Sequence, residues 1–329
     1  MRSAAVCLGL VLPLAAACGG GRAPSERHLV YVRETTPANA VIWIADASGR
    51  HAQRLTRGHA GIVSPDGRTV AIARSDGIYL VSSRGGHERR LTARAFGPQA
   101  WSPEGRWIVA ATPSLLALVD AHTGRSRVVA RGPLYGFGFS PDGRRLVYSR
   151  APRETRGAIC GDRMDLYVAD VSGGVPRRLT HDGRSAFPVW GSGRIAFARL
   201  PKRLAFGDCF APGIWSVRPD GSGLRSIVAR APYAIAHFGY YGLQPVAWLT
   251  GNELLVGVRS EWGNEAAVLD AATRRLRRLR AYVDEPSHDG RFALGSGGNE
   301  QITISITRVR DGRRIFVLRG NVCCPDWNR

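Results

Sequence analysis

The tetrapeptide Ser64-Pro65-Asp66-Gly67 decides the fold, because close copies of it recur at a fixed spacing. Ser102-Pro103-Glu104-Gly105 and Ser140-Pro141-Asp142-Gly143 follow at successive intervals of 38 residues. Proline presets φ at the second position of a tight turn, an acidic residue tolerates the third, and glycine takes the positive φ at the exit. Each copy therefore predicts a sharp reversal of the chain between two strands.

Weaker copies extend this repeat toward the end of the sequence, at Gly191-Ser192-Gly193, Leu249-Thr250-Gly251 and His288-Asp289-Gly290. An apolar run that predicts a β-strand follows each copy, and these runs are Thr69 to Ala73, Trp107 to Ala111, Arg145 to Ser149, Arg194 to Ala198, Leu254 to Val258 and Phe292 to Gly295. A second strand, a turn and a last short strand complete each unit. Four short strands in about 40 residues are typical of a β-propeller blade.

The turn, the apolar strand after it and the continuation from Leu166-Tyr167-Val168-Ala169-Asp170 to Arg178-Leu179-Thr180 resemble the WD40-like repeats of TolB-type propellers. The resemblance covers roughly residues 28–329 and implies a single all-β propeller domain. We expect no separate α/β domain before the repeats, which is a departure from TolB itself. The resemblance therefore implies the fold rather than TolB's particular role.

The strand sets predict seven blades, which begin near residues 28, 68, 106, 144, 194, 253 and 291. Residues 28–58 supply only three strands of the first blade. Cys324-Pro325-Asp326-Trp327 stands in the same register as the Ser-Pro-Asp-Gly turns, so we expect the C-terminal strand to complete that blade. A six-bladed ring, in which one weak unit is misassigned, is the alternative.

Residues 1–18 have the pattern of an export signal: a positive start, an apolar stretch from Ala4 to Ala17, and small residues before Cys18. The pattern resembles a bacterial lipoprotein signal, which implies lipidation of Cys18; ordinary cleavage that leaves this cysteine unmodified is the alternative. Residues 19–27 are typical of a flexible tether. We expect an exported protein, anchored by lipid to the cell membrane and facing the periplasm or the cell exterior.

The composition excludes several classes of protein. With 44% hydrophobic and 22% charged residues, the chain is neither disordered nor collagen-like, and no apolar run after the leader approaches the roughly 20 residues that cross a bilayer. The net charge is +20, and the basic residues behind it are almost all arginines, since Lys202 is the only lysine. Many arginines adjoin predicted turns or outer strands, so the charge is spread around the rim, which argues against nucleic-acid binding.

All the long insertions fall on one predicted face. With the strands of a blade labelled a to d from the axis outward, Arg150 to Asp165 and Leu200 to Pro212 are b–c loops, and Ala231 to Pro245 is a d–a loop. These loops leave a propeller on the same side, so we expect a loop-rich face over blades four to six. The residues expected to contact a ligand or partner there are Arg153, Arg156, Asp162, Arg163, Lys202, Arg203, Asp208, His237, Phe238, Tyr240, Tyr241 and Trp262. The alternative is that the aromatic residues pack onto their own blade and the arginines form a solvated rim.

Cys160 and Cys209 occupy equivalent loops of neighbouring blades, so we predict a disulfide between them; two free thiols are the alternative. Cys323 and Cys324 are compatible with a strained vicinal disulfide, with intermolecular pairing or with free thiols. No cysteine pair has zinc-type spacing and no HExxH motif occurs. We therefore expect no metal and no cofactor.

The sequence contains no G-x-S-x-G elbow, and its repeated aspartates lie in turns, where they cap the backbone. We expect a monomeric, non-catalytic binding or scaffold protein of the cell envelope, which engages an envelope protein or an anionic envelope polymer. One alternative is a propeller hydrolase or lyase that acts on envelope glycans, with Asp162, Asp208, His237 and Glu261 as acid or base groups. Another is a polyanion-binding protein.

Overall fold

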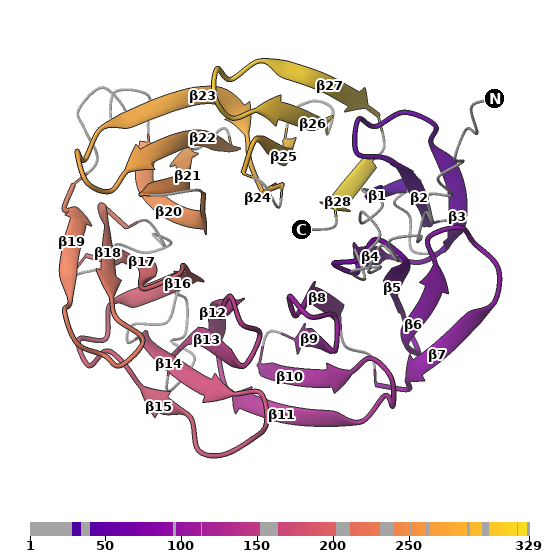
Figure 1. Cartoon of the computed structure of the whole chain (residues 1–329), viewed down its shortest axis with the longest axis horizontal. Helices are drawn as coiled ribbons and strands as arrows, with labels where there is room; N and C mark the ends of the chain where they lie inside the picture. The colour runs from indigo at the N-terminus through magenta and orange to yellow at the C-terminus, as the bar shows by residue number, and fades with distance from the viewer. Residues whose placement is uncertain are drawn as a thin grey trace, which may run out of the picture.

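Seven four-stranded antiparallel sheets surround a central opening in the computed structural model (Figure 1). The structure describes residues 28–33, 40–94, 97–112, 114–151, 164–201, 211–230, 240–249, 252–260, 263–287, 290–297, 303–320 and 322–327. The prediction of an all-β, seven-bladed propeller is confirmed, and the six-bladed alternative is wrong. Within these residues, no helix has the length and apolar character needed to cross a membrane.

Each blade runs from an inner strand at the opening to an outer strand at the circumference. Blade one consists of β28 (Val322–Trp327), β1 (His28–Arg33), β2 (Val41–Asp46) and β3 (Gln53–Arg57). Blades two and three consist of β4 (Ala60–Val63), β5 (Thr69–Arg74), β6 (Gly77–Ser82), β7 (Glu88–Thr92), β8 (Gly97–Trp101), β9 (Trp107–Thr112), β10 (Leu115–Asp120) and β11 (Ser126–Arg131). Blade four consists of β12 (Leu134–Phe139), β13 (Arg145–Arg150), β14 (Asp165–Asp170) and β15 (Arg177–Arg178).

The remaining three blades follow the same order from the axis outward. Blade five consists of β16 (Ser185–Trp190), β17 (Ile195–Arg199), β18 (Gly213–Val217) and β19 (Arg225–Val228). Blades six and seven consist of β20 (Tyr240–Trp248), β21 (Glu253–Ser260), β22 (Gly263–Asp270), β23 (Leu276–Tyr282), β24 (Glu285–Pro286), β25 (Phe292–Gly297), β26 (Thr303–Arg308) and β27 (Arg314–Arg319).

The hydrophobic core lies between adjacent blades. Leu146, Val147 and Tyr148, which are consecutive in β13, are all buried, because both faces of the sheet pack against a neighbour. Outer strands are covered on one side only, and β27 accordingly has exposed residues along its length. This arrangement explains why the second strand of each unit is a continuous apolar run in the sequence rather than an alternating one.

The Ser-Pro-Asp-Gly turns have the predicted conformation. Gly67 has φ of +75°, and the Ser64 hydroxyl accepts a hydrogen bond of 2.9 Å from the backbone N–H of Thr69. That hydroxyl also donates to the Asp66 carboxylate at 2.6 Å. The copy at Ser140 repeats both contacts, so serine, aspartate and glycine each have a fixed role in joining the inner strand to the next.

The C-terminal strand closes the ring, as predicted. β28 pairs with β1, with Trp327 opposite Leu29, and Figure 1 shows this end of the chain beside the central opening. The residues Cys324-Pro325-Asp326-Trp327 form part of β28 itself and do not make a turn after it. A buried tryptophan stands where the turns have a glycine, and it continues the extended backbone into the core.

Arginines of the outer strands bind the next blade around the ring. In each case a guanidinium donates to a backbone carbonyl in the neighbouring c–d turn: Arg89 to Ala121 at 2.8 Å, Arg127 to Val171 at 2.8 Å, Arg177 to Asp220 at 2.9 Å and Arg277 to Val309 at 2.9 Å. The several N–H groups of a guanidinium suit this contact. Part of the arginine excess therefore holds blades together.

Candidate functional site

The described strands place the three insertions in neighbouring blades. The first lies between β13 and β14, whose ends pair at Arg150 and Asp165, and the second lies between β17 and β18, whose ends pair at Arg199 and Gly213. The third connects β19 to β20. The predicted b–c, b–c and d–a connections are therefore confirmed for blades four, five and six.

Most of the predicted site residues lie outside the described residues. These are Arg153, Arg156, Asp162, Arg163, Lys202, Arg203, Asp208, His237, Phe238 and Trp262, together with Cys18, Cys160, Cys209 and Glu261. The side chains of Cys323 and Cys324 also lie outside the described part, although their backbone belongs to β28. The disulfide, lipidation and partner-contact predictions stay predictions.

Tyr240 and Tyr241 differ from their predicted position. The third insertion was expected to continue to Pro245, but β20 already begins at Tyr240 and its backbone pairs with Ser260 of β21. Hydrogen bonding to a long second strand extends the inner strand of blade six to nine residues. The two tyrosines therefore belong to an inner strand beside the axis, and not to the loop.

The base of the first insertion is fixed by Asp165, a buried carboxylate at the start of β14. It accepts hydrogen bonds from the Thr180 hydroxyl at 3.0 Å and the Gly183 backbone N–H at 3.1 Å, and it forms an ion pair with Arg178 at 2.5 Å. The Thr180 hydroxyl in turn accepts from the backbone N–H of Leu166 at 2.9 Å. This network ties the start of β14, where the insertion ends, to β15 and to the segment that follows β15.

The base of the second insertion is fixed by Arg199 at the end of β17. Its guanidinium lies 4.1 Å from the centre of the Trp215 ring and forms an ion pair with Asp182 at 2.7 Å. Arg150 makes the corresponding contact in blade four, 4.6 Å from the Tyr167 ring. Both insertions therefore start from arginines whose charge is stacked on an aromatic ring of the same blade.

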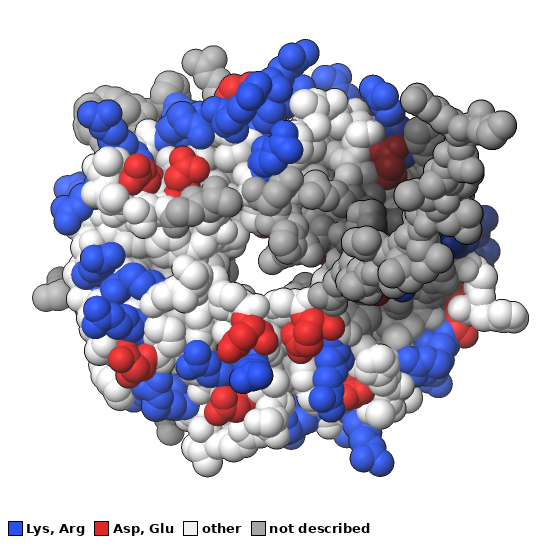
Figure 2. Space-filling model, in the orientation of Figure 1, with Lys and Arg blue, Asp and Glu red and all other residues white. Residues whose placement is uncertain are grey.

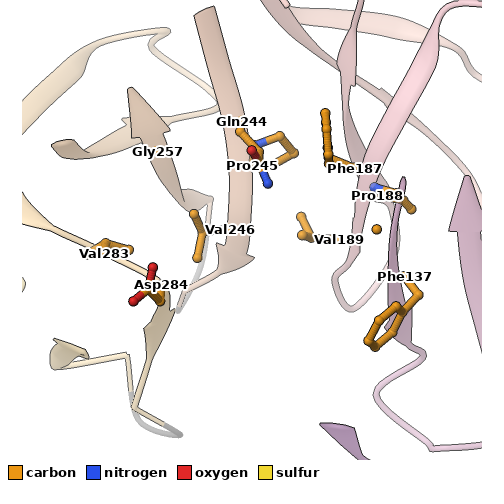
Figure 3. Close-up of a pocket in the computed structure, with 11 residues that line it drawn as sticks. Phe137, Phe187, Pro188, Val189, Gln244, Pro245, Val246, Gly257, Val283 and Asp284 are labelled. Atoms are coloured by element: carbon orange, nitrogen blue, oxygen red, sulfur yellow. The ribbon is translucent and has the colours of Figure 1, made fainter. Parts of the chain in front are cut away.

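A cavity of about 230 Å³ lies beside the axis, between the inner strands of blades four, five, six and seven. Its lining is Gly136, Phe137, Phe187, Pro188, Val189, Gln244, Pro245, Val246, Gly257, Val283 and Asp284, which are drawn in Figure 3 and, except for Gly136, labelled there. The register of β12, β16 and β20 shifts at this level, which marks a bulge in each of the three inner strands. The cavity is therefore a space left where three strands bend.

The wall between β12 and β16 is tightly built. Phe187 has φ of +52°, a conformation that costs energy for a residue with a side chain. Gly136, with φ of +83°, faces it: a Cβ on Gly136 would lie 2.9 Å from the Phe187 Cα. Only glycine permits this approach, which brings the two strands together on one side of the cavity.

Asp284 is the one ionisable residue among those that line the cavity. Its Oδ2 accepts two hydrogen bonds of 2.7 Å from Ser296, one from the backbone N–H and one from the hydroxyl. Solvent reaches the carboxylate through the channel, but protein surrounds it, and this desolvation raises the pKa of Asp284 against the opposing effect of the Ser296 hydrogen bonds. No turn motif marks Asp284 in the sequence, so it is not among the predicted site residues.

The described part of the chain contains no candidate metal site. Among those residues, no group of three or more His, Cys, Asp or Glu side chains is arranged to hold an ion.

The closed ring of seven blades defines the class of this protein as a seven-bladed β-propeller. No protein-family model matches the chain, and no curated protein matches its sequence significantly. TolB from Acinetobacter baumannii is similar in structure, with a TM-score of 0.55 and 16% identity over 93% of this chain and 67% of that chain.

Enzymes share the fold as well. An oligogalacturonate lyase from Vibrio parahaemolyticus has a TM-score of 0.55 and 14% identity, over 89% of this chain and 84% of the lyase. A puromycin-hydrolyzing peptidase from Mycobacterium tuberculosis has a TM-score of 0.61 and 19% identity, over 87% of this chain and 50% of the peptidase. At these identities the likeness shows the fold alone, and the same fold serves both TolB and enzymes.

Proposed function

We propose that this protein is an exported, lipid-anchored propeller that binds a partner in the cell envelope through its loop-rich face and acts as a scaffold without catalysis. One observation carries the proposal: the three long insertions arise from consecutive blades, in connections that leave the ring on the same side. The c–d turns are short in every blade, and so are the a–b turns of blades two to seven. Long loops gathered on a rigid ring are a common basis for recognition.

The bases of the insertions support this proposal, because they are rigid. Asp165 and Arg199 are held by ion pairs, and Arg150 and Arg199 are stacked on aromatic rings. A binding surface gains affinity when the elements that carry it are already ordered, because less conformational entropy is lost on association.

The distribution of charge supports a specific partner over a general polyanion. On the face seen in Figure 2, basic side chains lie around most of the circumference and do not form a single stripe. Several arginines are already engaged with backbone carbonyls of the next blade. Basic residues spread and paired in this way are poorly placed to follow a linear polymer.

Crosslinking in intact cells tests the proposal. The lipidated protein is crosslinked and recovered beside a variant in which residues 152–163 are replaced by a short turn. Val175→Ser is the matched control, since Val175 is 96% exposed on a short c–d turn. We expect one stoichiometric envelope protein with the unaltered chain and the control, and its loss with the shortened loop. Equal recovery from all three would overturn the proposal.

Two further outcomes identify the alternatives. Recovery of glycan in place of a protein would favour the enzyme or the polymer-binding interpretation, and turnover of that glycan would separate the two. A steep loss of affinity with rising salt indicates a polyanion, whereas a flat response indicates a protein partner. Replacement of Cys18 by serine tests the anchor: we expect the protein to leave the membrane fraction.

A further inference from the structure

We propose that the axial cavity between blades four and seven binds a small ammonium group carried on an apolar frame, with Asp284 as its counter-ion. The lining of this site comes from the inner strands, β21 and the connection into β24, and it includes none of the three insertions. It adds a ligand class that neither the motifs nor the similar structures indicate.

The size and lining of the cavity select the apolar part of the ligand. Phe137, Phe187 and Val246 contribute apolar surface from the inner strands of blades four, five and six, and Val283 adds to it from the connection into blade seven. A volume of about 230 Å³ is below the roughly 300–1,000 Å³ of sites that bury drug-sized molecules. The cavity therefore suits one aromatic ring or a short branched chain.

The carboxylate selects the polar part. Ser296 directs both of its donors to Oδ2 of Asp284, as given above, and no described residue donates to Oδ1, which can accept from a ligand. An ionised carboxylate only accepts hydrogen bonds, so its best partner is a cationic N–H donor. In Figure 3 the Asp284 carboxylate lies at one end of the group of apolar side chains.

Within the described part of the chain, Asp284 forms no ion pair with a basic side chain. The sequence has 46 lysines and arginines, and elsewhere in the described part Asp165, Asp182 and Glu88 each form an ion pair with arginine. None of the residues lining the cavity is basic. The adjacent Glu285 accepts from the backbone N–H of Trp327, so it is directed to β28. Asp284 is exposed to solvent, and its negative charge lies beside the apolar lining of the cavity, where a cationic N–H donor is its best partner.

The cavity is built by strained and irregular backbone. The bulges of β12, β16 and β20 and the positive φ of Phe187 all occur on its wall. Strain of this kind is retained where the surrounding structure fixes it, and it clusters at binding sites. Four blades define the shape together, so the site is preorganised by the closed ring.

Calorimetric titration of the purified protein with matched probes tests the proposal. The probes are 2-phenylethylamine, the neutral 2-phenylethanol and the anionic 3-phenylpropionate. We expect the amine to bind at least about tenfold more tightly than the alcohol, which corresponds to one charge-assisted hydrogen bond. The carboxylate should not bind. Equal affinity for amine and alcohol, or no heat from the amine up to about 10 mM, would overturn the proposal.

Two variants and a control assign the binding to this cavity. Asp284→Asn keeps the size of the side chain and should weaken amine binding about tenfold or more, with the affinity for the alcohol unchanged. Val246→Trp fills the cavity and should abolish binding of both. Asp76→Asn removes a carboxylate from the turn between β5 and β6, outside the cavity lining, and should change neither. Unaltered amine affinity in Asp284→Asn, with an unchanged thermal unfolding profile, would overturn the assignment.

A competition experiment distinguishes the two sources of such an ammonium group. A short peptide that begins with phenylalanine is compared with its N-acetylated form as a competitor of 2-phenylethylamine. Displacement by the free peptide alone indicates that the site accepts a chain terminus. Binding of the small amine without displacement by either peptide indicates a free metabolite-sized amine. Both outcomes support the ammonium site, and displacement by the acetylated peptide to the same extent would contradict it.

Discussion

The Asp326 carboxylate accepts a hydrogen bond of 2.7 Å from the backbone N–H of Val63, which lies 263 positions earlier in the chain. Asp326 belongs to β28 and Val63 to β4, so this bond joins the inner strands of blades one and two. On the other side, the Trp327 indole donates to the Pro286 carbonyl of blade seven at 3.0 Å. β28 therefore contacts both neighbouring blades as well as its own sheet, and ring closure is concentrated in one strand.

Truncation of Trp327 should destabilise the ring strongly. Its side chain is buried, and Trp327→Ala would leave a large void at the junction of blades one and seven. We expect a loss of about 3–5 kcal/mol in the free energy of unfolding, measured by urea denaturation. Trp327→Phe removes the hydrogen bond to Pro286 but keeps most of the packing, and it should cost about 1 kcal/mol. Equal costs for the two variants would contradict this account of closure.

Gly136→Ala should be more harmful than an equivalent change at Gly85. Both glycines have φ near +80°, at +83° and +82°, so alanine pays a similar backbone penalty at each. A Cβ on Gly136 would lie 2.9 Å from the Phe187 Cα, whereas one on Gly85 would meet nothing within 4 Å. We expect Gly85→Ala to cost about 1 kcal/mol and Gly136→Ala about 1–3 kcal/mol more. Thermal unfolding measures the difference, and equal melting temperatures would show that the strands can move apart.

Replacement of Asp165 by alanine should loosen the base of the first insertion. The change leaves Thr180 and the Gly183 N–H without their acceptor, and we expect a loss of about 1–3 kcal/mol in unfolding free energy. Asp165→Asn keeps an acceptor oxygen and should lose less. Hydrogen exchange should show faster exchange at Leu166 in the alanine variant, because Thr180 no longer holds that N–H. Unchanged exchange there would indicate that the network does not order the insertion.

Acid should remove the contribution of Asp142 to stability. The hydrogen bond from the Ser140 hydroxyl, and then that from the Arg144 N–H, hold the pKa of Asp142 below its ordinary value. A carboxyl whose pKa is lower in the folded state stabilises the fold above its unfolded pKa of about 3.9, and this stabilisation is lost as the pH falls through the folded pKa. The difference in unfolding free energy between the unaltered protein and Asp142→Asn should therefore shrink below about pH 4. A difference that is constant with pH, measured by denaturant titration, would refute the assignment.

The fold was largely predictable because the conformation of its a–b turns is set by the residues of the turns themselves. Each of the four residues from Ser64 to Gly67 has a local role in the turn. The same turn can therefore be recognised wherever its residues recur, and their recurrence every 38 residues predicts the repeating blade. Closure of the ring was predictable as well, because residues 28–58 supply only three strands and the C-terminal segment supplies the fourth. The start of β20 at Tyr240 was not predicted, because pairing with the long β21 overrides the loop-like composition of that segment.

The axial cavity was not predictable from the sequence. It depends on bulges in three strands and on a positive φ at Phe187, a residue type that gives no sign of either. Arg177 could be assigned to an outer strand, but its carbonyl acceptor at Asp220 is 43 residues away in the next blade. Contacts between blades follow from the closed geometry, and no local motif specifies them. The partner-contact residues on the insertions remain predictions to be tested.

The position of β1 between two partners gives the ring a mechanical property. Leu29 pairs with Trp327 on one side and with Ala45 on the other, and most of β1 is bonded in the same way along its length. Tension applied at His28 would therefore have to break two ladders of hydrogen bonds together before the chain could be drawn out. A first strand paired on one side only would have to break a single ladder, so the pairing of β1 on both sides strengthens the ring against pulling from its N-terminal side.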